Sequence, residues 1–132
     1  IGHDAPGGTS RQVVRIILAD RAAGNYLGKV AVARDAQKSD GSQSVKAMLV
    51  EAGPTANLKP ELEIFADDVK CAHGATVGEL DRDALFYLAS RGLPEADARA
   101  LLTRAFVADA IDRAGEAAVR EALHEDAEAW LG

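Results

Sequence analysis

The chain has 132 residues, 48% of them hydrophobic, and a formal net charge of -6. That length suits one domain of ordinary size, or one domain with an appendage, and it supplies enough apolar residues for a core. Residues 1–80 carry nine Lys or Arg against ten Asp or Glu, and residues 81–132 carry six against eleven, so neither part offers the basic surface that nucleic-acid backbones require.

The longest nearly apolar run, VVRIILA at residues 13–19, is too short to span a bilayer and already contains an arginine. The chain begins at Ile1 without a methionine or a charged, apolar leader. We therefore expect a piece of a longer cytoplasmic protein, with no membrane partner. One cysteine cannot form an internal disulfide, which fits a reducing compartment.

Up to about residue 80 the hydrophobic pattern has a period of two, which predicts short β-strands with one buried face. The predicted strands cover residues 13–19, 26–33, 45–51, 61–66 and 75–80. The segments between them, DRAAGN, RDAQKSDGSQS and GPTANLKP, are rich in residues that form turns. Five short strands at nearly even spacing predict an all-β sandwich, a barrel or a solenoid, and the pattern does not choose among them.

After residue 80 the period becomes that of α-helices. Asp81 is placed as the N-cap of a helix over residues 82–91, and Gly92 stands where a left-handed residue ends a helix. Pro94 suits the first position of a second helix. Apolar stripes with a spacing of three and four extend over this helix and a last one; they comprise Ala98, Leu101, Leu102, Ala105 and Phe106, then Val119, Leu123, Ala127 and Trp130. This helical appendage is expected to pack on the β part or to present a face to a partner.

The segment DDVKCAHGAT holds the single cysteine, Cys71, two positions before His73. On a strand both side chains would share one face within about 7 Å, so both would reach one metal or one reactive species. However, a structural zinc needs four protein ligands and an iron–sulfur cluster usually needs four thiolates. From residue types alone we favour a buried cysteine beside a hydrogen-bonded histidine. The alternative is a stand-alone metal-dependent enzyme that uses the pair.

Other candidate chemistry is weaker. Asp67 and Asp68 are interpreted as a solvated turn or cap, because neighbouring residues on a strand point to opposite faces and would not share a proton. The sequence has no G-x-S-x-G elbow and no Walker-type phosphate loop, so no hydrolase triad or ATP site is predicted. The aromatic residues of the helical part are core residues by default, with a partner interface as the alternative; they are Phe86, Tyr87, Phe106 and Trp130.

Three stretches resemble a known family: AQKSDGSQ at residues 36–43, KPELEIFADDVKCAHGATVGELDRDALFYLASRG at 59–92, and LLTRAF at 101–106. Together they closely resemble the C-terminal region of the SufB/SufD family of iron–sulfur cluster assembly proteins. The form DDVKCAHGATVG is similar to the SufD branch, because the SufB branch typically has a His-Glu pair in this segment. The stretch after Arg113 matches only loosely.

The resemblance implies a mainly β fold with C-terminal helices. Residues 1–80 would be the final turns of a right-handed parallel β-helix (a β-solenoid), and residues 81–132 would be a small helical domain. In the family, SufB and SufD pair through their β-helices, and each helical domain holds a copy of the ABC-type ATPase SufC. The implied function is a scaffold subunit rather than an enzyme, with no stably bound cofactor, a transient iron–sulfur cluster at the SufB interface and ATP on the SufC partner.

The resemblance also implies site residues. Cys71 and His73 would lie near the interface at which SufB supplies a thiolate, and His73 would bind metal transiently with ligands from the partner. We expect His73 to be the functional member of the pair and Cys71 to fill a small apolar site. The docking face for the ATPase is expected to include Phe86, Tyr87 and Arg91, beside the turn at Gly92. Without SufB, the exposed β edge is expected to permit a symmetric homodimer.

Overall fold

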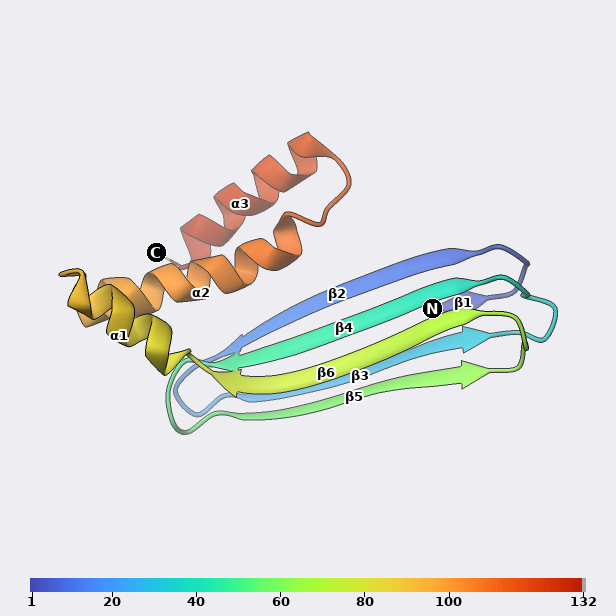
Figure 1. Ribbon diagram of the computed structural model, residues 1–132, viewed down its shortest axis with the longest axis horizontal. Helices are drawn as coiled ribbons and strands as arrows, with labels where there is room; N and C mark the ends of the chain where they lie inside the picture. Colours follow the sequence, from blue (N-terminus) through green and yellow to red (C-terminus); the bar gives the residue numbers. More distant parts are fainter. Residues whose placement is uncertain (132) are drawn as a thin grey trace.

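The computed structural model describes residues 1–131, which form two parallel β-sheets followed by three helices (Figure 1). The strand orders are β1-β3-β5 and β2-β4-β6, and every pairing is parallel. Consecutive strands alternate between the two sheets, which face each other. The strands are β1 (Gly2–His3), β2 (Thr9–Leu18), β3 (Ala23–Val32), β4 (Asp40–Leu49), β5 (Thr55–Ile64) and β6 (Lys70–Glu79). The predicted mainly β fold with C-terminal helices is confirmed.

The strands are longer than the sequence pattern predicts. Residues 40–44 and 55–60 were assigned to turns, but they belong to β4 and β5, and the short β1 was not predicted. Strand β4 was missed in its first half because the inward positions there are Gly41 and Gln43 rather than apolar residues. Pro60 is tolerated within β5 because β5 lies at the edge of its sheet, where a missing N–H breaks no ladder on the open side.

One buried cluster of the core lies between the two sheets, at the end where β3 leads into β4 and β5 leads into β6. Its fully or nearly buried members are Val30, Val32, Ala36 and Ala66. Cys71 is one of the partly buried residues packed against this cluster. The first residues of β6 are therefore anchored on the core although β6 is an edge strand.

The helices are α1 (Arg82–Ser90), α2 (Glu95–Ile111) and α3 (Ala117–Leu131). Asp81 is the N-cap of α1, as predicted, because its carboxylate accepts hydrogen bonds from the backbone N–H groups of Asp83 and Ala84 at 2.9 and 3.1 Å. Gly92 follows α1 with a φ of 89°, the left-handed conformation expected of a C-terminal glycine. Pro94 is the N-cap of α2 rather than its first residue. Within residues 1–131, no helix is long and apolar enough to cross a membrane.

Among the three helices, α2 makes the contact with the sheet β2-β4-β6, through strand β2. The Arg15 guanidinium of β2 pairs with the Asp109 carboxylate of α2, with Nε 2.8 Å from Oδ2, and it lies 6.0 Å from the centre of the Phe106 ring. Phe106 is thus partly buried, in line with the prediction. The same prediction is wrong for the other helical aromatics: the exposed fractions are 77% for Phe86, 55% for Tyr87 and 73% for Trp130. They lie on α1 and α3; Figure 1 shows α3 on the side of α2 that faces away from the sheets.

Candidate functional site

Strand β6 carries Cys71 and His73 and forms one edge of its sheet. The two residues are two positions apart on one strand, so their side chains lie on the same face, as predicted. Cys71 is half-buried, whereas His73 and the remainder of the strand are exposed. Cys71 faces the interior, because a Cβ atom added to Gly41 on the neighbouring strand would lie 3.5 Å from the Cys71 sulfur. The structure brings the pair together on a strand that is supported on one side and open on the other.

A group of amides lies in the interior next to His73. Strand register places Gln12, Gln43 and His73 in one row across β2, β4 and β6. Gln43 is 2% exposed, and its Nε2 donates to Gln12 Oε1 at 2.6 Å and to Tyr26 Oη at 2.9 Å. We call Gln12, Tyr26 and Gln43, two amides and one phenol hydroxyl, the interior polar cluster. The hydrophobic pattern of the sequence does not reveal this cluster, because it places Gln43 in a turn between two strands, within the stretch AQKSDGSQ.

Gly28 of β3 makes space for this cluster. A Cβ atom at this position would lie 2.3 Å from Tyr26 Oη and 2.6 Å from Gln43 Nε2, closer than such atoms can approach. The glycine therefore permits the hydrogen bond between the two sheets. Glycines in strands often mark such a close approach, and this was the sequence signal that could have revealed the cluster.

The donor atoms at the start of β6 are one thiol and one imidazole. Among residues 1–131, no group of three or more His, Cys, Asp or Glu side chains is arranged to hold a metal ion. Cys71 and His73 could supply at most two of the four ligands that zinc sites and iron–sulfur clusters usually have. Any such centre here needs ligands from outside residues 1–131.

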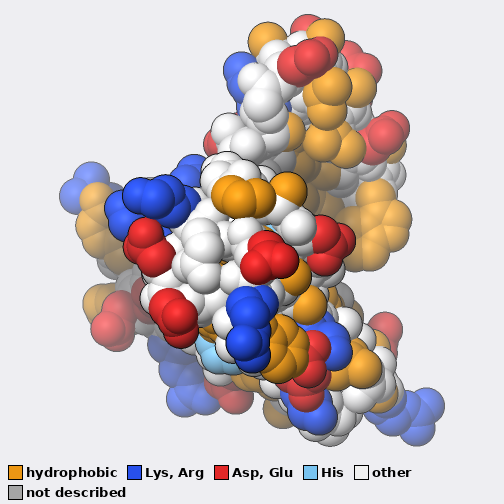
Figure 2. All heavy atoms as spheres, turned by 90° about the vertical axis from the view of Figure 1, so that its right-hand side faces the viewer, with side chains coloured by type: hydrophobic (Ala, Val, Ile, Leu, Met, Phe, Trp, Pro, Cys, Tyr) orange, Lys and Arg blue, Asp and Glu red, His pale blue; other side chains and the backbone are white. Residues whose placement is uncertain are grey.

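Asp67 and Asp68 lie in the exposed connection between β5 and β6. The Asp68 backbone N–H donates to Gln37 Oε1 at 2.9 Å, and the Asp68 carboxylate lies 3.7 Å from Lys38 Nζ. The prediction of a solvated turn is confirmed. Figure 2 shows this end of the molecule, over which acidic and basic side chains are interspersed. The start of β6 therefore has no surface of a single charge sign beside it.

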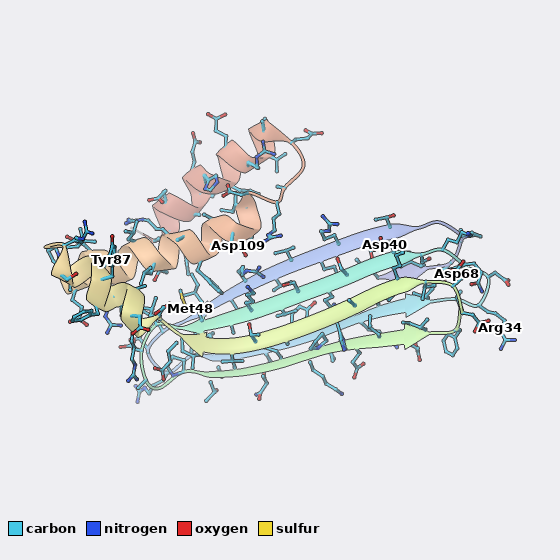
Figure 3. The ribbon with its side chains drawn as sticks, in the orientation of Figure 1. Arg34, Asp40, Met48, Asp68, Tyr87 and Asp109 are labelled. Carbon is cyan, nitrogen blue, oxygen red and sulfur yellow. The ribbon has the colours of Figure 1, made fainter. Side chains whose placement is uncertain are left out.

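The residues predicted to bind the ATPase lie where α1 follows β6, at the end of the molecule opposite to the start of β6. Phe86 and Tyr87 are exposed, and the Arg91 guanidinium lies 4.9 Å from the centre of the Tyr87 ring. Gly92, with its positive φ, stands in the turn that follows α1. Figure 3 shows Tyr87 and Asp68 at opposite ends of the structure. At the rise of a parallel strand, about 3.3 Å per residue, roughly 20 Å separate His73 from Glu79 at the end of β6.

Comparison with known proteins agrees with these features. The family model for the SufBD core domain of SUF-system iron–sulfur cluster assembly matches residues 1–106. The chain is 42% identical over 100 residues to the iron–sulfur cluster assembly protein SufD of Escherichia coli. The aligned region covers 76% of this chain and 24% of that protein. It is 38% identical over 125 residues to an iron–sulfur cluster assembly SufBD family protein of Synechocystis. This alignment covers 95% of this chain and 28% of that protein.

The chain thus spans about a quarter of the length of these two curated relatives. The match includes the strands that carry Cys71, His73 and Gln43, and it continues through α1 into α2. On this evidence the chain belongs to the SufB/SufD family of the SUF system for iron–sulfur cluster assembly, in its SufD branch.

Proposed function

We propose that the chain acts as a non-catalytic scaffold subunit of a SUF complex in the cytoplasm. In this proposal it pairs with a SufB-like scaffold along β6 and binds a SufC-like ABC ATPase through its helices. A nascent iron–sulfur cluster, the cargo of the complex, forms transiently at the SufB-like interface, and ATP stays on the ATPase. The observation that supports this proposal most directly is the open edge of β6, which exposes His73 on a strand that is firmly held on its other side.

The β part is proposed to be the end of a right-handed parallel β-helix, with the helical domain beginning after about residue 80. Two observations support this. Strands alternate between two parallel sheets, and equivalent positions recur at similar intervals, as Thr9, Asp40 and Lys70 do. Such an arrangement stacks one turn of chain on the next. Strands β5 and β6 would then be the last turn within residues 1–131.

Pairing through β6 follows from its backbone. The Lys70 N–H donates to Ser39 O at 2.8 Å, so the backbone groups of Lys70 and of every second residue after it face β4. The groups of Cys71, His73 and Ala75 face the other way and are open to a strand from another chain. An open edge of this length favours pairing with a partner strand. A SufB-like strand there would bring its thiolate close to His73.

Binding of the ATPase is assigned to α1 because the aromatics on this helix are exposed. Large aromatic side chains commonly anchor protein interfaces, and an Arg stacked on Tyr is a frequent companion. Phe86 and Tyr87 fit that role better than core packing, since both are more than half exposed. Strand β6 runs directly from His73 to α1, so a force applied to α1 would reach the cluster site through a single strand.

Co-expression with a SufB-like scaffold and a SufC-like ATPase tests the proposal. We expect all three chains to co-purify. Phe86→Ala should release the ATPase but keep the scaffold, whereas Ala75→Pro on the open edge should release the scaffold but keep the ATPase. Loss of neither partner from either variant, in chains that remain folded, would contradict the assignment of the two surfaces.

A further inference from the structure

Gln43 has a buried side-chain oxygen whose partner is missing. Within residues 1–131, Oε1 of Gln43 is fully buried and accepts no hydrogen bond. The two protons on Nε2 are already used, because Nε2 donates to both Gln12 Oε1 and Tyr26 Oη. Buried acceptors without a partner are rare and destabilising, so this oxygen calls for a donor.

The orientation of the Gln43 amide is set by its two acceptors. Gln12 lies on β2 and Tyr26 on β3 of the opposite sheet, and both accept from the same nitrogen. The amide nitrogen is therefore held toward β2 and the interior. Its carbonyl oxygen lies on the other side of the amide group, and the remaining neighbour of β4 in the sheet is β6.

The residue of β6 in register with Gln43 is His73. Side chains of register partners on adjacent strands stand about 5 Å apart on the same face of the sheet. Each tautomer of an imidazole carries one ring N–H donor, so His73 can supply the donor that Gln43 lacks. In the row Gln12, Gln43 and His73, each side chain would then bond to the next.

We propose that Gln43 is a positioning residue for His73: the exposed imidazole rotates so that one ring N–H donates to the buried Oε1, a hydrogen bond that is not formed among residues 1–131 as the structure describes them. This rests on the proposed function in that it assigns His73 to cluster assembly. The bond determines which ring nitrogen carries the proton and turns the other nitrogen, with its lone pair, toward the open edge of β6. Histidines that bind metals generally donate their second ring N–H to a carbonyl or carboxylate in this way. Gln43 itself does not contact the cluster.

Nitrogen NMR of the labelled chain tests the bond without any partner. In the wild type we expect one dominant tautomer of His73, with widely separated shifts for the two ring nitrogens and a ring N–H signal that is protected from exchange with water. Gln43→Met keeps the length of the side chain and removes the acceptor, so the two shifts should approach each other. Asn57→Met is the control, since it removes an exposed amide that pairs with Asn25 outside this row and leaves both acceptors of Gln43 in place.

An unprotected ring N–H in the wild type would overturn the proposal even if Gln43→Met failed to fold. Equal shift separation in a folded Gln43→Met variant would also overturn it. The consequence for function is measured separately, as the rate of cluster assembly in the complete complex. Gln43→Met is expected to lower this rate about 10-fold, as is usual when a residue that orients a metal-binding histidine is lost.

The two readouts separate the two claims. A full assembly rate for Gln43→Met, when His73→Ala is impaired, would exclude a positioning role in assembly. If His73→Ala itself assembles clusters normally, the proposed function of His73 fails, while the hydrogen bond is still decided by the NMR measurement.

Discussion

Arg15 of β2 and Asp109 of α2 form a hydrogen-bonded ion pair although they are 94 residues apart in the chain. The Arg15 side chain is only 5% exposed, whereas that of Asp109 is 38% exposed. Arg113, one turn further along α2, donates to the other oxygen of Asp109 at 2.9 Å. Figure 3 shows Asp109 on α2 above the sheet. The pair links the helical part to the strand farthest from the open edge of the same sheet.

Removing Asp109 is predicted to weaken this link. Asp109→Ala leaves the buried Arg15 guanidinium without its carboxylate partner, although Arg15 still donates to the carbonyl oxygen of Val14. The free energy of unfolding should therefore fall by about 2 kcal/mol. In urea denaturation, the double variant Arg15→Met/Asp109→Ala should lose less than the sum of the two single variants. Glu95→Ala is the control, because the Glu95–Arg99 pair is exposed and should be worth about 0.5 kcal/mol or less. Additive losses at Arg15 and Asp109 would show that the pair does not couple the two parts.

The same pair predicts a pH dependence. The hydrogen bond from Arg113, and to a smaller extent the one from Arg15, holds the pKa of Asp109 below its usual value. Because the pKa is lower in the folded chain than in the unfolded one, the stabilisation is complete above the ordinary aspartate pKa of about 4 and is lost as pH falls through the folded value. Below about pH 4 the wild type should therefore lose stability more steeply than Asp109→Asn. Parallel stability curves for the two proteins would contradict this.

Substitution of the α1 aromatics should affect binding rather than folding. Phe86 is 77% exposed, so Phe86→Ala is predicted to leave the melting temperature unchanged while weakening ATPase binding by about 2 kcal/mol. Tyr87→Ala should act in the same direction. Trp130→Ala on α3 is the matched control, since Trp130 is 73% exposed but lies on another helix. Calorimetric titration with the ATPase gives the comparison, and an equal loss of affinity in the Trp130 variant would move the docking face away from α1.

Self-association of the isolated chain should depend on the edge of β6. Without a scaffold partner, two open edges are expected to pair into a symmetric dimer. Ala75→Pro removes an N–H that faces away from β4, so it should abolish the dimer without breaking the ladder to β4. Ala75→Gly is the control that keeps the N–H. Light scattering at high concentration measures the mass, and a wild-type chain that stays monomeric would contradict the prediction.

The helices are easier to predict from the sequence than the strands, for a physical reason. Helix α1 was found because Asp81 and Gly92 supply local end signals that act within one turn. The first half of β4 was missed because its inward positions, Gly41 and Gln43, are not apolar. They are held by backbone pairing with strands about 30 residues away, and no local pattern reports such a contact.

The candidate site shows the same division. The shared face of Cys71 and His73 follows from their spacing and was predicted. The exposure of His73, the contact of Cys71 with the core and the neighbouring Gln43 depend on how three strands are stacked. The exposure of Phe86 and Trp130 was not predictable from their helical spacing, because spacing shows which residues share a face and not whether another element covers it.

The rate of cluster formation in a reconstituted complex tests the central claim, that His73 on the open edge of β6 takes part in cluster assembly. Wild type, His73→Ala and Cys71→Ala would be compared with the SufB-like and SufC-like partners at equal occupancy, and cluster formation followed by absorbance. We predict that His73→Ala folds, retains both partners and forms clusters much more slowly, whereas Cys71→Ala has a smaller effect. A wild-type rate for His73→Ala would contradict the account.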